Sequence, residues 1–281
     1  MRKSCPIKKS LVNHNLFKIA ILLVVLLVAP FHAAMADELN AKFEKSDGYS
    51  HYKKGMDHMK QGLCGKAIPE YLKSLELFPD NYLVYSALGY AYFYSGKFEV
   101  ALECFRKSIS LKPDFADAMR GIACVYMGIG QENEAAIYFR KAIELEPAII
   151  SPYMALGTIY NNKGNYREAI PLFNKVVEAA PNLDNAYFEL GRAYGAIGEN
   201  GLAIKNYEKC IDINPNLRRT YLPLSACYAV KGDYRKALRY ADMSRRLSPD
   251  DKAAKRAIRS AYYKIMEERQ DRQREETTKE P

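Results

Sequence analysis

The fold is decided by residues Tyr82–Asp114, which read YLVYSALGYAYFYSGKFEVALECFRKSISLKPD. Two apolar runs are separated by Ser95-Gly96 and closed by Pro113. The apolar positions of the first run recur after three and four residues, which places them on one helix face: Tyr85, Leu88, Gly89 and Tyr92. The second run repeats that spacing with Val100, Ala101, Cys104, Phe105 and Ile109. The stretch therefore predicts two helices joined by a glycine turn.

The same hairpin recurs every 34 residues. Proline marks the period without any insertion, at Pro79, Pro113, Pro147, Pro181, Pro215 and Pro249. A fixed period of this length is typical of stacked helical repeats, because one hairpin cannot bury its apolar faces alone. The sequence therefore predicts an all-α chain of stacked helix-turn-helix repeats.

These repeats resemble the tetratricopeptide repeat family. The resemblance is carried by a small residue, the tyrosine three places later, an alanine, an aromatic residue and the proline, and the small residues are Gly89, Ala123, Gly157, Gly191 and Ser225. It covers six units, residues 48–251, although the sixth unit has Ala241 at the aromatic place. The resemblance implies a right-handed α-solenoid whose concave groove takes extended peptides or partner helices.

Two details of the hairpin can be predicted from its residues. We expect Gly89 and Ala101 to mark the close crossing of the two helices. The residue after the proline is usually Asp or Asn, as at Asp80 and Asp114, and we expect it to cap the next helix.

The N-terminal residues 1–36 read as a secretory signal. Basic residues precede a short apolar run, and Ala34-Met35-Ala36 forms an A-x-A cleavage pattern before Asp37. The sequence thus predicts an exported protein of the bacterial periplasm. The alternative is an uncleaved segment that anchors the chain in the inner membrane through residues 17–31.

The remaining segments follow from composition. Residues 37–47 are predicted to be a polar tether, and residues 252–266 carry a helical apolar stripe that would cap the sixth unit. Residues 267–281 are almost devoid of apolar side chains and predict a charged tail, either a frayed helix or disordered.

The net charge is +9, from 42 basic and 33 acidic residues, but residues 1–36 contain five basic residues and no acid. The remainder therefore carries 37 minus 33, or +4, and we expect no nucleic-acid partner. Between Arg218 and Lys264 there are thirteen Lys or Arg against four Asp. This basic region is either a solvated face or a surface for an acidic partner or anionic lipid headgroups.

Five cysteines follow the predicted signal: Cys64, Cys104, Cys124, Cys210 and Cys227. An exported chain meets an oxidising compartment, so a bridge between Cys104 and Cys124 is one hypothesis. The alternative is that they are buried free thiols.

The sequence offers little for catalysis. After the predicted signal only His51 and His58 remain, and seven helical residues separate them by about 10.5 Å, which is too far for one metal ion. Nucleophile-elbow, zinc-protease and phosphate-loop motifs are all missing from the sequence. We therefore predict no enzyme activity, no cofactor and no metal site.

A binding surface is the better hypothesis. On the helical wheel a second stripe of each first helix points away from the partner helix of its own repeat. Aromatic and apolar side chains dominate this stripe early in the chain, and amides and arginines dominate it later. The predicted partner-binding residues are Tyr52, Met56, Tyr90, Phe93, Tyr94, Arg120, Asn161, Asn162 and Arg192. The alternative is that these side chains only pack against neighbouring first helices and bind no partner. If the stripe does bind a partner, we expect replacement of Tyr90 and Phe93 by alanine to abolish that binding and to leave stability unchanged.

Together these features predict a non-enzymatic protein–protein interaction scaffold in the cell envelope that binds a peptide or partner helix. The alternative is a membrane-tethered accessory factor of an envelope assembly machine for secretion, pilus or polysaccharide export. A third hypothesis is a binder of anionic polymers that uses the basic region.

Overall fold

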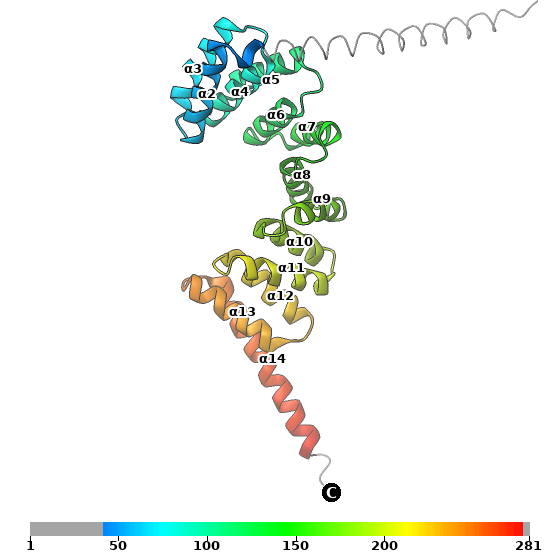
Figure 1. Ribbon diagram of the computed structural model, residues 1–281. Helices are drawn as coiled ribbons and strands as arrows, with labels where there is room; N and C mark the ends of the chain where they lie inside the picture. Colours follow the sequence, from blue (N-terminus) through cyan, green and yellow to red (C-terminus); the bar gives the residue numbers. More distant parts are fainter. Residues whose placement is uncertain (1–41, 278–281) are drawn as a thin grey trace, which may run out of the picture. The chain divides into compact units, whose positions relative to one another are not determined.

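The computed structural model describes residues 42–277, with side chains up to Arg274 (Figure 1). Within this range the chain is helical and contains no strand, and the predicted all-α solenoid of helix-turn-helix repeats is confirmed. The helices fall into two compact units that divide between Pro113 and Asp114. The predicted signal segment lies outside the described residues. Among the described helices, none is both long and apolar enough to cross a membrane.

The first unit contains two hairpins, α2/α3 and α4/α5. Their bounds are α2 Asp47–Lys60, α3 Cys64–Leu77, α4 Tyr82–Tyr94 and α5 Phe98–Leu111. Apolar side chains from the hairpins share one core that includes Tyr71, Leu75, Val84 and Leu88.

Phe43 also belongs to this core, although the sequence placed it in a polar tether. Its ring is 1% exposed and lies 5.2 Å from the ring centre of Phe78 and 5.5 Å from that of Tyr49. The segment before α2 is therefore fastened to the first hairpin by one aromatic side chain, since burying such a ring contributes roughly 2 kcal/mol.

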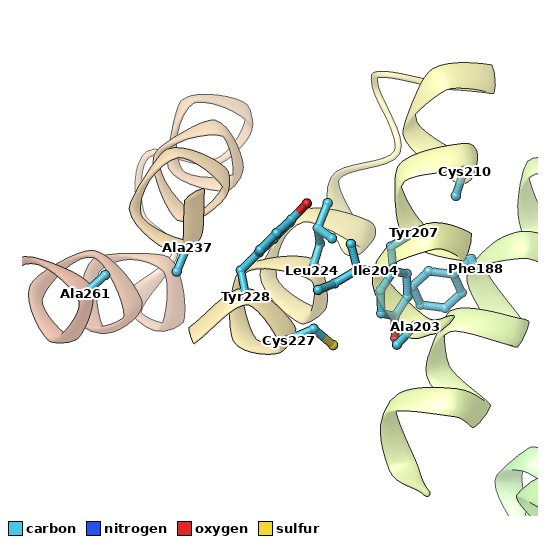
Figure 2. Close-up of a cluster of buried hydrophobic side chains, with 10 residues drawn as sticks. All are labelled: Phe188, Ala203, Ile204, Tyr207, Cys210, Leu224, Cys227, Tyr228, Ala237 and Ala261. Atoms are coloured by element: carbon cyan, nitrogen blue, oxygen red, sulfur yellow. The ribbon is translucent and has the colours of Figure 1, made fainter. Parts of the chain in front are cut away.

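The second unit contains four hairpins and a last helix. Their bounds are α6 Ala116–Gly128, α7 Glu132–Leu145, α8 Ser151–Asn162, α9 Tyr166–Ala179, α10 Asp184–Ala196, α11 Asn200–Ile213, the short helix η1 Arg218–Thr220, α12 Tyr221–Val230, α13 Tyr234–Leu247 and α14 Lys252–Thr277. Figure 2 shows the core at the C-terminal end of this unit, where Tyr207 of α11 lies beside Phe188 of α10, and Leu224 and Tyr228 come from α12. Ala261 joins α14 to the same core.

Helix α14 runs further than the predicted capping helix. It has 26 residues and continues through most of the predicted tail. Charged pairs one turn apart support the extension, with Lys264 Nζ 2.7 Å from Glu267 Oε2 and Arg274 Nη1 3.6 Å from Asp271 Oδ1. The part after Met266 is thus a charged helix with little apolar surface to bury.

Glycine ends the first helix of every hairpin. The residues Gly62, Gly96, Gly130, Gly164, Gly198 and Gly232 have φ between 73° and 84° and follow the 34-residue period. At Gly96 the left-handed conformation lets the chain reverse within three residues, so that Lys97 N bonds back to Tyr92 O at 2.9 Å.

The close contact inside a hairpin joins the first-helix glycine to the second-helix aromatic residue. A Cβ added at Gly89 would lie 2.8 Å from the ring of Phe105, and the corresponding glycines Gly55, Gly157 and Gly191 face Tyr71, Phe173 and Tyr207 in the same way. The expected pairing of Gly89 with Ala101 is therefore wrong, because the ring one turn further along α5 fills the crossing.

The sixth repeat closes its crossing differently. Ser225 takes the place of glycine and donates a hydrogen bond to Ala237 O at 2.7 Å. Ala241 is fully buried at the aromatic place, and the neighbouring Tyr240 stacks on Tyr228 with ring centres 5.5 Å apart. In this repeat, therefore, the small residues Ser225 and Ala241 and the stack of Tyr240 on Tyr228 replace the glycine–aromatic contact.

The capping prediction is correct only in part. Asn81, not Asp80, caps α4 by accepting from Leu83 N at 3.0 Å, and α6 has no side-chain cap. At α4 and α6 the N-cap is the second residue after the proline, Asn81 and Phe115, which leaves Asp80 and Asp114 one place before the capping position. Asp251 does cap α14, through Ala253 N at 2.8 Å.

We expect Gly89→Ala to lower the free energy of unfolding by about 0.5–2 kcal/mol. The added methyl meets a fully buried ring and overpacks the crossing, while the better helix propensity of alanine offsets part of this loss. Gly65→Ala is the matched control, because Gly65 is also helical and a Cβ there meets nothing within 4 Å. Urea unfolding of both variants measures the difference, and equal midpoints would contradict the crowded crossing.

The five described cysteines are free thiols, including Cys104 and Cys124, so the hypothesised bridge is not formed. Burial raises the pKa of the Cys104 thiol to about 12, and burial also raises the pKa of Cys124, Cys210 and Cys227. These thiols are small apolar groups of the core and are poor nucleophiles.

We expect Cys104 to resist alkylation in the native protein, because at pH 8 a thiol with that pKa is thiolate in only roughly one molecule in ten thousand. Cys64 is only partly buried and should react first. Timed iodoacetamide labelling followed by peptide mass spectrometry measures both rates. Equal rates would show that Cys104 is not held in the core.

Candidate partner-binding surfaces

Each first helix carries the stripe of side chains that the helical wheel predicts to point away from its own hairpin. We call it the first-helix face and define it by Leu83, Ser86, Tyr90, Phe93 and Tyr94 in α4 and by the residues one or more repeat periods before or after them. These positions return to the same side of the helix every three or four residues. The face is described separately for the two units.

In the first unit the face is aromatic, and much of it is packed. Tyr90 is half-buried, with its ring centre 4.9 Å from that of Phe105 in an edge-to-face contact. Phe93 is also half-buried and lies 5.2 Å from Tyr94 and 5.8 Å from Phe98. Because its ring packs on the core, we expect replacement of Tyr90 to lower stability, unlike the expectation from the sequence.

Two predicted residues of the first unit are open to a partner. Tyr94 is 65% exposed at the end of α4, and Met56 is 37% exposed on α2. Tyr52 is half-buried, and its ring centre lies 6.0 Å from that of Tyr71. Met56 and Tyr94 thus expose a flexible thioether and an amphipathic ring on adjacent first helices, and side chains of this kind suit protein partners.

In the second unit three residues of the face, Asn161, Asn162 and Arg192, form a cluster with Glu189 of α10, and we call these four residues the polar cluster. Asn161 is 3% exposed, and its amide nitrogen donates to Glu189 Oε2 at 2.9 Å and to Glu189 O at 3.1 Å. Arg192 Nη2 lies 2.8 Å from Glu189 Oε2 and 3.1 Å from Asn162 Oδ1. The cluster therefore links α8 to α10 through one buried carboxylate.

The polar cluster positions Arg192 and pairs its positive charge with a carboxylate. The Glu189 side chain is 8% exposed and neutralises the guanidinium, whose side chain is 36% exposed. Charge-assisted bonds of this type are short and directional. The exposed part of Arg192 and the Asn162 amide are thus held at the surface, where each can bond to a peptide backbone.

Arg120 is the remaining predicted residue, and it lies outside the polar cluster. It pairs with Asp117 one turn earlier on the same helix, α6. Of the four polar residues predicted in this unit, the structure therefore brings together Asn161, Asn162 and Arg192.

Sequence reasoning missed Glu189, although a signal was available. The repeat positions equivalent to Glu189 hold Lys53, Ala87, Gly121, Ala155 and Pro223. An acidic residue at a place where no other repeat has one indicates a specific partner, and that partner is Asn161 one repeat earlier.

The described residues contain no group of His, Cys, Asp and Glu side chains that could hold a metal ion. His51 instead lies 2.7 Å from Glu70 Oε2, and this hydrogen bond lowers the pKa of the Glu70 carboxyl. The pair joins α2 to α3 within one hairpin, so its role is structural.

Three family models described as tetratricopeptide repeat match residues 82–115, 116–149 and 149–216. No curated protein matches the chain. The chain belongs to the tetratricopeptide repeat family. Its repeats form a protein–protein interaction scaffold, and members of the family are generally non-enzymatic.

Several solved structures share the fold. YrrB, described as a TPR protein with an unusual peptide-binding site, is 23% identical with a TM-score of 0.63, and the match covers 67% of this chain and 97% of YrrB. A MamA protein is 25% identical, with a TM-score of 0.56 and coverage of 60% and 92%. PilF of Pseudomonas aeruginosa is 18% identical, with a TM-score of 0.66 and coverage of 74% and 95%. For YrrB and PilF the likeness shows the fold alone.

Proposed function

We propose that this scaffold works in the bacterial cell envelope and holds an extended peptide or a helix of a partner protein on its first-helix faces. The observation that carries the proposal is the exposure of Met56 and Tyr94 on the two first helices of the first unit. The polar cluster of the second unit adds groups that suit a peptide backbone. The signal-like residues 1–36 support the location.

We expect the double variant Met56→Ala and Tyr94→Ala to weaken binding of the natural partner at least about tenfold, because hot-spot residues of an interface contribute more than about 1 kcal/mol each. The partner is first identified by affinity capture from native envelopes, and its dissociation constant is then measured with purified proteins. Both side chains are exposed, so thermal unfolding should stay near wild type.

Leu72→Ala is the matched control, because Leu72 is a 43% exposed apolar residue on the second helix α3. It should bind as the wild type does. An unchanged dissociation constant for the double variant would remove Met56 and Tyr94 from the binding surface.

A membrane-tethered accessory factor of an envelope assembly machine is the second candidate. It is favoured by one observation, the apolar run within residues 17–31 that precedes the repeats. N-terminal sequencing of the protein extracted from cells separates the two: a chain that starts at Asp37 has been released, whereas an intact N-terminus supports the tether.

A further inference from the structure

The space between neighbouring first helices is filled between α8 and α10 but open between α12 and α14. The polar cluster fills it between α8 and α10. The positions two repeats after Asn161, Glu189 and Arg192 are Ala229, Ala257 and Ser260, which lie between α12 and α14. Three small side chains thus stand where an amide, a carboxylate and a guanidinium stand earlier in the chain.

The small side chains leave a cavity of about 220 Å³ that is open to one side. Helix α12 contributes Leu222, Ala226 and Ala229 to its lining, and α14 contributes Ala257, Ser260 and Ala261. The hydroxyl of Ser225 is already donated to Ala237 O, so the lining is mostly apolar. Since cavities of roughly 150 Å³ hold a benzene ring, this one has room for one large apolar side chain.

The stretch of chain that contains all the lining residues is basic in composition. Residues 218–264 carry thirteen Lys or Arg and four Asp, and three of these acids are engaged: Asp233 with Lys236, Asp242 with Arg245 and Asp250 with Lys255. Arg256 lies one turn before Ser260 on the same side of α14 and makes no ion pair among the described residues. This charge complements an acidic partner.

We propose that the α12–α14 cavity is a docking site for one apolar side chain of an acidic protein segment. The proposal rests on the proposed function and adds the chemistry of the partner: a leucine-like anchor enters the cavity, and flanking carboxylates meet Arg256 and the neighbouring cations. The apolar cavity makes binding selective for a large apolar side chain, and Arg256 and the neighbouring cations attract the acidic segment to the cavity.

The test uses fluorescein-labelled peptides in which a central leucine is flanked by glutamates, measured by fluorescence anisotropy with the full chain. We expect the leucine peptide to bind at least about tenfold more tightly than the same peptide with a central serine, which is the factor for burying a leucine side chain. Replacing the glutamates by lysines should abolish binding. Equal affinities for the leucine and serine peptides would overturn the proposal, because charge alone would then explain the binding.

Two matched pairs of variants locate the site. Ser260 is exposed, so Ser260→Leu fills the cavity without disturbing the core and should weaken the leucine peptide about tenfold, whereas Ser260→Ala should not. Arg256→Glu should lower the affinity for the leucine peptide and make that affinity less dependent on salt. Arg269→Glu, further along α14, should leave both the affinity and its salt dependence unchanged. Wild-type affinity in Ser260→Leu would place the peptide elsewhere.

The alanine methyl signals of Ala226, Ala229 and Ala257 provide a direct readout by nuclear magnetic resonance. They should shift on addition of the leucine peptide and stay in place with phosphatidylglycerol vesicles. If the vesicles shift them and the peptide does not, the cavity belongs to a lipid and the proposal is wrong. The two proposals can fail separately. If the Met56 and Tyr94 double variant loses natural-partner binding but the leucine peptide does not shift the alanine methyl signals, the proposed function is supported and this inference is wrong.

Discussion

Phe105→Ala should lower the free energy of unfolding by about 3–5 kcal/mol, the usual loss when a fully buried phenylalanine is truncated. The Phe105 ring is completely buried, faces the bare backbone of Gly89 and supports the ring of Tyr90 at 4.9 Å. Its removal opens a cavity at the crossing of α4 and α5, and glycine has no side chain that could move into it.

Tyr94→Ala is the matched control, because it truncates an aromatic side chain of the same hairpin that is 65% exposed. It should change stability by no more than about 0.5 kcal/mol. Urea unfolding followed by circular dichroism measures both variants, and their midpoints are compared because repeat arrays need not unfold in one step. A Phe105→Ala midpoint equal to that of Tyr94→Ala would show that the crossing does not stabilise the unit.

The sixth repeat shows that this contact is one of two ways to close a hairpin. Ala241 replaces the aromatic residue, and its neighbour Tyr240 stacks on Tyr228 while both hydroxyls face Glu208 Oε1, at 3.4 and 2.5 Å respectively. The stack moves aromatic surface from the crossing to the outside of the hairpin. A missing aromatic residue in the repeat pattern therefore does not indicate a missing core.

The period and the helical spacing sufficed to predict the hairpins, their glycine turns and the all-α stack, because these features depend on residues close in sequence. The helical wheel directed Tyr90 away from the second helix of its own hairpin, although the ring packs on Phe105 of that helix. It could not show that Tyr90 rests on Phe105, since a wheel gives direction around a helix but not the axial position of its neighbour. For the same reason Gly89 was paired with Ala101, one turn from its true contact.

The candidate surfaces were predicted less completely. Asn161, Asn162 and Arg192 were named one by one, but their assembly depends on Glu189, whose amide partner lies 28 residues away. The α12–α14 cavity could not be predicted at all, because it arises from alanines that read as ordinary helix formers. Both features depend on contacts between repeats, which the pattern within one repeat does not contain.

Glu189→Ala should lower the free energy of unfolding of the second unit by about 2–3 kcal/mol. The variant leaves Arg192 without its carboxylate and removes one of the two acceptors of the Asn161 amide. Breaking a fully buried ion pair in this way costs about 3–5 kcal/mol, and the partial exposure of Arg192 lets water recover some of that loss. Thermal and urea unfolding measure the change.

Glu178→Ala is the matched control, since Glu178 pairs with Lys175 at 3.3 Å in the same unit but both side chains are 66% exposed. Its loss should be below about 1 kcal/mol. Glu189→Gln should retain more stability than Glu189→Ala, because the amide oxygen still accepts from Asn161 and Arg192. Equal stability of Glu189→Ala and Glu178→Ala would mean that the polar cluster does not join α8 to α10, and Arg192 would then be as mobile as any surface arginine and a poor anchor for a peptide.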